Sequence, residues 1–282
     1  MTKVLQSRCE QVFAIPKTPD TNHIKGDLFM GLWTLTHLYQ LLPTVLVFAV
    51  LSVVAAKTLG RLEKKYRYIP LQVIAVLLLV LEVMKQINNA KDGSYDLYAL
   101  PFHYCSLFLY FLPFHAFYHG KYSHITDTVS LACLASMTLD MIIMPAVIYS
   151  DGNIKNYLES FGDFHTVTFH NLIILYFLLT LALRLYDFRT RHDMKVISIA
   201  LAIYVAIAAT MSYTLKVNYH NLYKCNVGFI ENIRLAVVEK IGVFGSVLYV
   251  AIMFVLTILF AFAAYFLTRL AIKPFYKPQK VN

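Results

Sequence analysis

The chain has 282 residues, of which 59% are hydrophobic and 15% charged, and its mean hydropathy is +0.59. A water-soluble domain normally carries about 25% charged residues, so lipid must be the solvent for most of this chain. The net charge of +9 does not indicate a nucleic-acid partner, because the basic residues stand in short segments between apolar stretches, where they act as topology signals.

Seven apolar segments are long enough to cross a bilayer, whose hydrocarbon core of roughly 30 Å needs about 20 helical residues. In chain order they are residues 35–56, 69–90, 100–118, 126–149, 165–186, 196–215 and 242–270. Residues 73–84 and 250–262 are continuously apolar and do not alternate with a period of two, which disfavours a β-barrel. The sequence therefore predicts an all-α polytopic membrane protein, a bundle of about seven transmembrane helices.

The predicted domain organisation is simple: a polar N-terminal extension at residues 1–30, a transmembrane domain at 31–272 and a basic C-terminal tail at 273–282. The extension has no apolar core, so we do not expect a cleavable signal peptide. Basic clusters follow the first, fifth and last segments. Basic loops favour the cytoplasmic side, which predicts a multi-pass protein of the cell membrane with its N-terminus outside and its C-terminus in the cytoplasm.

The cysteines leave two alternatives open. Cys9 and Cys225 would both face outside, where they could form a disulfide or remain free thiols. Cys105 and Cys133 lie within predicted spans.

Polar side chains within the predicted spans gather at one depth. Ionisable groups inside a bilayer are costly and usually functional. Near the outer side we expect His37, Glu82, Lys85, Gln86, His103, Cys105, Asp140, His165, His170, Asn171, Asn218, Tyr219 and His220. The last span adds only hydroxyl groups. A second group, His115, His119 and His124, surrounds the short inner loop, and we expect those histidines to be ordinary interfacial residues.

Cys105 is the candidate nucleophile of the outer group. If Pro101 begins the third helix, Cys105 lies about one turn in, where the helix dipole favours thiolate over thiol. His103 would then point elsewhere, roughly 200° around the helix. The general base is therefore expected from another span, with His170 as first choice and His165 as second.

The remaining residues of the outer polar group would support this reaction. Asn218 or the Tyr219 hydroxyl could stabilise a developing oxyanion. Glu82 and Lys85 are spaced i, i+3 and could neutralise each other, and Asp140 could pair with a buried cation.

A family resemblance adds to this interpretation. The run of Glu82, Lys85, Gly93, Ser94 and Tyr95, followed by the LPxHxC segment from Leu100 to Cys105 and by Ser106, resembles the YwaF-like bacterial integral membrane proteins. The likeness extends to His37, Pro145, Thr168, Phe169, His170, Asn218 and Tyr219. That family is distantly similar to eukaryotic transmembrane cysteine acyltransferases, which move fatty acyl groups between phospholipids. By this resemblance Cys105 matches the nucleophile and His170 the base.

The leading functional prediction is a membrane-embedded phospholipid acyltransferase or acyl hydrolase that uses Cys105 and His170 near the outer leaflet. Membrane lipids would be its partners, and we expect neither a metal nor another cofactor. The alternatives are a zinc-dependent membrane hydrolase and a polar-solute transporter or receptor with an outward-facing pocket. The first would take its ligands from the set His37, His103, Asp140, His170 and His220. The sequence does not determine the oligomeric state.

Overall fold

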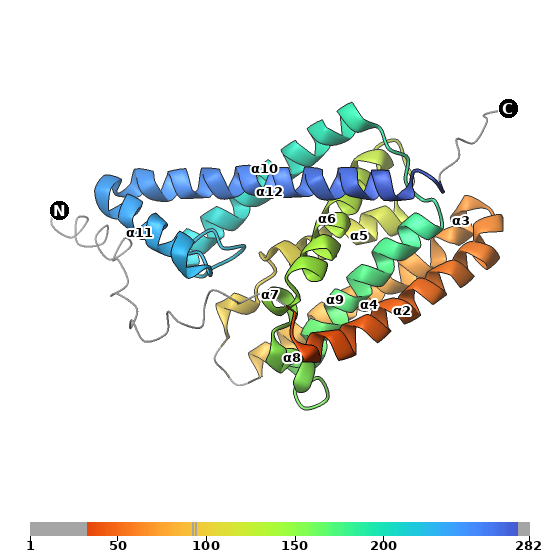
Figure 1. Ribbon diagram of the computed structural model, residues 1–282, viewed down its shortest axis with the longest axis horizontal. Helices are drawn as coiled ribbons and strands as arrows, with labels where there is room; N and C mark the ends of the chain where they lie inside the picture. The colour runs from red at the N-terminus through yellow and green to blue at the C-terminus, as the bar shows by residue number, and fades with distance from the viewer. Residues whose placement is uncertain (1–32, 92, 94, 276–282) are drawn as a thin grey trace.

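The computed structural model describes residues 33–91, 93 and 95–275, and this part of the chain is mainly helical, with no strand (Figure 1). The longer helices are α2 (Leu35–Thr58), α4 (Ile69–Ala90), α5 (Leu107–Phe117), α6 (Ser123–Ile143), α9 (Phe161–Ala182), α10 (Thr190–Leu215), α11 (Gly228–Ile241) and α12 (Val243–Ile272). The short helices are α3 (Lys64–Arg67), α7 (Pro145–Tyr149) and α8 (Asp151–Lys155). Three-residue turns of 3₁₀ helix cover Leu59–Arg61, Leu97–Ala99 and Tyr104–Ser106. The predicted all-α class is confirmed.

Within the described residues, six helical stretches are long and apolar enough to cross a membrane. They are Leu35–Arg61, Lys64–Ala90, Ser123–Ile143, Phe161–Ala182, Thr190–Leu215 and Val243–Ile272. The shortest has 21 residues, which at about 1.5 Å per residue spans the hydrocarbon core. The chain is therefore a multi-pass membrane protein, as predicted.

The third predicted span, residues 100–118, is shorter than expected. Its α-helix α5 has 11 residues and covers only about half of a bilayer core. The backbone of His103 is extended (φ −70°, ψ 157°), and a 3₁₀ turn at Tyr104–Ser106 leads into α5. Pro101 therefore does not begin the helix. Cys105 lies in the turn that precedes α5, and the prediction that it stands one turn into an α-helix was wrong.

The fourth predicted span, residues 126–149, ends early for a local reason. Met144 stands before Pro145 and has non-helical angles (φ −133°, ψ 63°), because the proline ring disfavours the helical conformation at the preceding residue. Helix α6 therefore stops at Ile143, and the chain turns through the short helices α7 and α8 before α9 begins.

Helix α6 is the centre of the bundle. Every residue from position 128 to 138 is buried, so this helix is covered on all sides, by α5, α9, α10 and α12. Helices α2 and α4 pack on α9, and α5 lies between α4 and α6. Figure 1 shows the long helix α12 crossing α6. The bundle thus holds the start of α5 close to the ends of α4 and α9.

Helix α11 was not predicted, because its polar and apolar residues are mixed. None of its residues is buried, Phe229 is 69% exposed, and the helix packs against α12.

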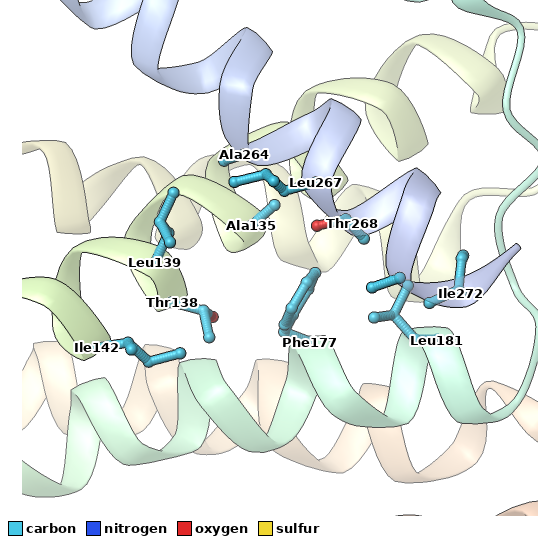
Figure 2. A pocket seen from close by; sticks show the side chains of 11 residues that line it. Ala135, Thr138, Leu139, Ile142, Phe177, Leu181, Ala264, Leu267, Thr268 and Ile272 are labelled. Atoms are coloured by element: carbon cyan, nitrogen blue, oxygen red, sulfur yellow. The ribbon is translucent and has the colours of Figure 1, made fainter.

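An apolar groove with a volume of about 220 Å³ opens between α6, α9 and α12 (Figure 2). Ala135, Leu139, Phe177 and Leu267 contribute to its lining. Ser136, which hydrogen-bonds to the turn that carries Cys105, projects from a different face of α6. The groove is therefore separate from the site that contains Cys105.

Candidate functional site

The end of α4 carries a buried ion pair. Glu82, Lys85 and Gln86 share one face of the helix because they are three and four residues apart. The Lys85 Nζ atom lies 2.8 Å from Glu82 Oε2, and Gln86 Nε2 donates to Glu82 Oε1 at 2.5 Å and to the Ala99 carbonyl at 2.9 Å. The Tyr95 hydroxyl donates to Gln86 Oε1. Glu82 is 8% exposed, so both charges are held largely away from water, and the expected pairing of Glu82 with Lys85 is present.

Helix α9 brings two buried histidines to this end of the bundle. His165 Nε2 lies 3.9 Å from Glu82 Oε2 and is buried without a hydrogen-bond partner. His170 Nδ1 donates to the Thr166 carbonyl at 2.7 Å, because a carbonyl can only accept. A neutral His170 protonated at Nδ1 has a free lone pair on Nε2, so this tautomer can accept a proton. The edge of the His170 ring faces the Tyr149 ring at 5.6 Å between centroids.

Cys105 is a half-buried free thiol in a turn that neighbouring helices hold in place. The Tyr104 hydroxyl lies 2.6 Å from Ser136 Oγ on α6, and the Tyr204 hydroxyl on α10 donates to the Phe102 carbonyl at 3.2 Å. Both contacts flank the thiol in sequence. The position of Cys105 is thus set by contacts of its turn with two helices, α6 and α10.

Lys85 connects these parts of the site. Its ammonium group pairs with Glu82, which His165 also approaches, and Gln86 on the same helix bonds to the Ala99 carbonyl in the segment that leads to Cys105. No hydrogen bond joins Cys105 to His170 in the described part of the chain. We call the six residues Cys105, Glu82, Lys85, Gln86, His165 and His170 the Cys105 cluster. It combines a thiol, a cation and an imidazole whose Nε2 can accept a proton.

Asn218 and Tyr219 lie in the loop after α10, where they serve its structure. The Asn218 Oδ1 atom accepts the backbone N–H groups of Tyr223 at 3.2 Å and Lys224 at 3.1 Å. The fully buried Tyr219 donates its hydroxyl to the Leu97 carbonyl, and its ring contacts that of His103 at 5.1 Å between centroids. Asn218 therefore holds the loop together internally, and Tyr219 holds it against the segment that contains Leu97 and His103. Their predicted role at an oxyanion stays a prediction.

His37 and Asp140 lie apart from these contacts. His37 is fully buried and forms a capping box with Thr34 at the start of α2, with 2.8 Å between Thr34 Oγ1 and His37 Nδ1. Asp140 is half-buried near the end of α6, and within the described residues its carboxylate has no ion pair or hydrogen bond. The predicted pairing of Asp140 with a buried cation is not observed.

The histidines of the zinc alternative each have a different partner. His103 Nε2 lies 3.0 Å from the Tyr98 carbonyl, and His220 Nε2 lies 3.0 Å from Thr257 Oγ1. His37 and His170 bond to residues of their own helices, as described above. Among the described residues these side chains do not converge on a common point that could hold a metal ion.

The opposite end of the bundle contains a polar group that the sequence analysis undervalued. His115 is 1% exposed, and its Nδ1 atom lies 2.7 Å from the Tyr176 hydroxyl. His124 Nε2 lies 2.9 Å from Oδ1 of Asp193, which is fully buried. His115 and His124 thus have specific partners inside the bundle, and their expected place at the membrane interface stays a prediction. The signal that could have found them is Asp193, an acidic residue in the first turns of an otherwise apolar helix.

Comparison with known proteins gives one match. No curated protein and no solved structure is significantly similar to this chain. A model of the TMEM164 family, a family of transmembrane proteins, matches residues 32–265, which include every helix that contributes to the Cys105 cluster. Because this match covers most of the sequence, the chain belongs to the TMEM164 family.

Proposed function

We propose that the Cys105 cluster transfers fatty acyl groups from phospholipids through a thioester on Cys105. One observation carries the proposal: the free thiol of Cys105 follows a segment that Gln86 bonds to the end of α4, where the Glu82–Lys85 ion pair lies beside the buried, unpartnered Nε2 of His165. A cation near a nucleophile can stabilise a thiolate and the oxyanion that forms when it attacks. The LPxHxC segment resembles the YwaF-like membrane proteins, and the distant similarity of that family to cysteine acyltransferases supports the same roles.

In the first half-reaction His170 Nε2 accepts the proton of the Cys105 thiol, and the thiolate attacks the carbonyl carbon of an acyl ester. The tetrahedral oxyanion is stabilised by the Lys85 ammonium group. When the ester C–O bond breaks, the leaving alkoxide takes the proton from His170 and departs as a lysophospholipid. Cys105 and His170 must approach to hydrogen-bond distance for this step, and such contacts often tighten only when substrate binds.

In the second half-reaction the thioester passes its acyl group to an acceptor. His170 Nε2 takes a proton from the hydroxyl of a lysophospholipid, whose oxygen attacks the thioester carbonyl, and the Cys105 sulfur leaves as a thiolate that regains the proton. If water attacks instead, the product is a free fatty acid. The ratio of the two acceptors distinguishes an acyltransferase from an acyl hydrolase.

Glu82 positions Lys85 in this scheme, and His165 lies beside Glu82. The 2.8 Å ion pair holds the ammonium group at the end of α4, and Gln86 fixes the other carboxylate oxygen at 2.5 Å. His165 Nε2, which is buried and unpartnered 3.9 Å from Glu82, is available as an additional hydrogen-bonding group when substrate enters.

The decisive experiment is intact-mass analysis of purified protein incubated with phospholipid vesicles. Wild type is expected to gain the mass of one acyl chain, and hydroxylamine, which cleaves thioesters, should remove it. Cys105→Ala should gain nothing. Cys133→Ala is the matched control because Cys133 is a free thiol that is only 2% exposed, and this variant should still be acylated.

An acyl adduct that persists in Cys105→Ala would contradict the proposal. So would a wild type that gains no acyl mass although a thiol reagent labels Cys105. Uptake of a polar solute that depends on Glu82 but not on Cys105 would favour the transporter alternative.

A further inference from the structure

A buried carboxylate lies at the end of the bundle opposite the Cys105 cluster. Asp193 stands in the first turns of α10 and is fully buried. Its two oxygens have different surroundings. The Oδ2 atom accepts the backbone N–H of Arg189 at 2.6 Å and the hydroxyl of Tyr265 on α12. This atom is fixed by hydrogen bonds and orients the whole carboxylate.

The other oxygen, Oδ1, faces two imidazoles. His124 Nε2 on α6 lies 2.9 Å away, and His192 Nδ1 lies 3.8 Å away. The three donor atoms all lie within 4.8 Å of one another. The Thr128 hydroxyl also donates to Oδ1 at 3.3 Å. His124, His192 and Asp193 therefore point their donor atoms toward one small region.

We propose that His124, His192 and Asp193 bind a divalent transition-metal ion, zinc being the expected one, which joins α6 to the start of α10. Zinc bonds to histidine nitrogen and carboxylate oxygen are about 2.0–2.2 Å long, so tetrahedral ligands stand about 3.4 Å apart. The observed separations of 2.9 Å and 3.8 Å bracket that value. Small side-chain rotations complete the geometry.

The surroundings of Asp193 fit a metal-bound carboxylate. Ligating carboxylates are usually hydrogen-bonded through their second oxygen, which here is Oδ2 with Arg189 and Tyr265. His192 is 53% exposed and His124 is 17% exposed, which leaves a route for the ion and a fourth position for water. A site with three protein ligands and one open position is typical of accessible zinc centres.

The ligand types also exclude the common hard cations. Calcium and magnesium prefer oxygen ligands, and calcium sites usually supply several carboxylates. This group offers a single carboxylate, and the adjacent residues Arg189 and Arg191 oppose a purely electrostatic cation site. Imidazole nitrogen binds zinc by coordination, so the proposal is specific to transition metals.

The test is metal binding by the full-length protein, purified without a polyhistidine tag and stripped with a chelator. Equilibrium dialysis against Zn²⁺ followed by elemental analysis should give one zinc per chain. Cobalt substitution should give the visible absorption of a four-coordinate ion. Zinc should also raise the melting temperature, because it binds the folded state preferentially. Dialysis against Ca²⁺ or Mg²⁺ should give no saturable binding.

The informative variant is His192→Ala. Because His192 is more than half exposed, its removal leaves the contacts of Asp193 with His124, Tyr265 and Arg189 in place and should not impair folding. We expect its zinc affinity to fall at least about tenfold, because substitution of a group that merely supports a metal ligand already lowers metal affinity by about this factor. His124→Gln can still hydrogen-bond to Asp193 and should lose affinity similarly. His119→Ala, which removes a nearby exposed histidine outside the group, should bind zinc as wild type does.

Absence of saturable zinc uptake by wild type would overturn the proposal. It would also be overturned if His192→Ala bound zinc as tightly as wild type. Acylation of Cys105 is not part of the readout, so this test is independent of the proposed enzymatic function.

Discussion

The two polar clusters of this membrane protein differ in how completely their charges are satisfied. In the Cys105 cluster a carboxylate and an ammonium group pair at 2.8 Å, while His165 Nε2 beside them is buried without a partner. In the group formed by His124, His192 and Asp193, both oxygens of Asp193 are surrounded by hydrogen-bond donors, which come from α6, from α12 and from the residue before α10. The first arrangement leaves a buried polar atom without a partner, whereas the second ties helices together.

Burial makes that difference meaningful. A buried polar atom without a partner costs about 1–3 kcal/mol, so its retention indicates either a function or an ordered water. When a buried carboxylate has all its hydrogen bonds, these bonds offset part of the free-energy cost of removing it from water, and they stabilise one arrangement of the helices. We therefore expect substitutions in the Cys105 cluster to reduce activity more than stability, and substitutions around Asp193 to do the reverse.

The largest expected effect is that of Cys105→Ala. Loss of the nucleophile should lower acyl transfer by at least about a thousandfold, because removal of a covalent nucleophile eliminates the pathway that the rest of the site supports. The melting temperature should change little, since Cys105 is half-buried. Transfer of a labelled acyl chain between phospholipids in vesicles measures the effect. Residual activity above one tenth of wild type would refute covalent catalysis by this residue.

Substitution of His170 should have the second-largest effect on acyl transfer. His170→Gln removes the proton acceptor, and positioned general bases typically contribute about 10²–10⁴-fold to a rate. His165→Gln is the matched comparison, because it removes an imidazole of the same helix and a similar exposure, 7% against 8%. Single-turnover formation of the thioester is the measurement. If His165→Gln is the inactive variant and His170→Gln is active, the base is His165.

Variants of the Glu82–Lys85 ion pair can distinguish an effect on activity from an effect on stability. Lys85→Met leaves Glu82 buried without its cation, and breaking such a pair can cost up to about 3 kcal/mol. The double variant Glu82→Gln with Lys85→Met removes both charges and should recover most of the lost melting temperature. It should not recover acyl transfer, which needs the ammonium group. Recovery of activity in the double variant would show that Lys85 has only a structural role.

Asp193→Asn should lower the stability of the fold and leave acyl transfer unchanged. The single oxygen of the asparagine amide can still accept the Arg189 N–H and the Tyr265 hydroxyl, but its NH2 group replaces Oδ1 and cannot accept from the Thr128 hydroxyl or from His124, so at least one donor is left unpaired. We expect a loss of about 1–3 kcal/mol in unfolding free energy, and normal acyl transfer by the protein that remains folded. Asp187→Asn is the control, because Asp187 is exposed in the preceding loop. A stability equal to that of the control would mean that the Asp193 contacts contribute little.

Hydrophobicity predicted most of the fold, because a membrane-spanning helix can be recognised from the length and apolar character of its own segment. Helix α4 has the predicted bounds, and α2, α9, α10 and α12 lie within several residues of theirs. The sequence analysis failed where a local contact overrode hydrophobicity. The extended backbone of His103 delays α5, and Pro145 stops α6.

The candidate site was predictable only in part. The Glu82–Lys85 pair follows from helical spacing, which is a property of one segment. The approach of His165 to Glu82 depends on how α9 packs against α4, and no spacing along the chain contains that information. The same is true of the contact between His124 on α6 and Asp193 on α10.

The smallest expected effect concerns Asp151, an exposed carboxylate that serves as a reference for the two buried ones. The Lys155 ammonium group at 2.5 Å, together with the Thr34 hydroxyl at 2.8 Å, lowers the pKa of Asp151 to about 2. A carboxylate with a lowered pKa in the folded state stabilises the fold above its unfolded pKa of about 4, and this contribution is lost as the pH falls toward 2. Wild type should therefore melt slightly above Asp151→Asn at pH 6, and the difference should shrink at pH 3. A difference that stays constant between these pH values would show that the ionised carboxylate is not what joins the start of α2 to α8. Because surface ion pairs contribute little, the shift should be much smaller than that of Asp193→Asn.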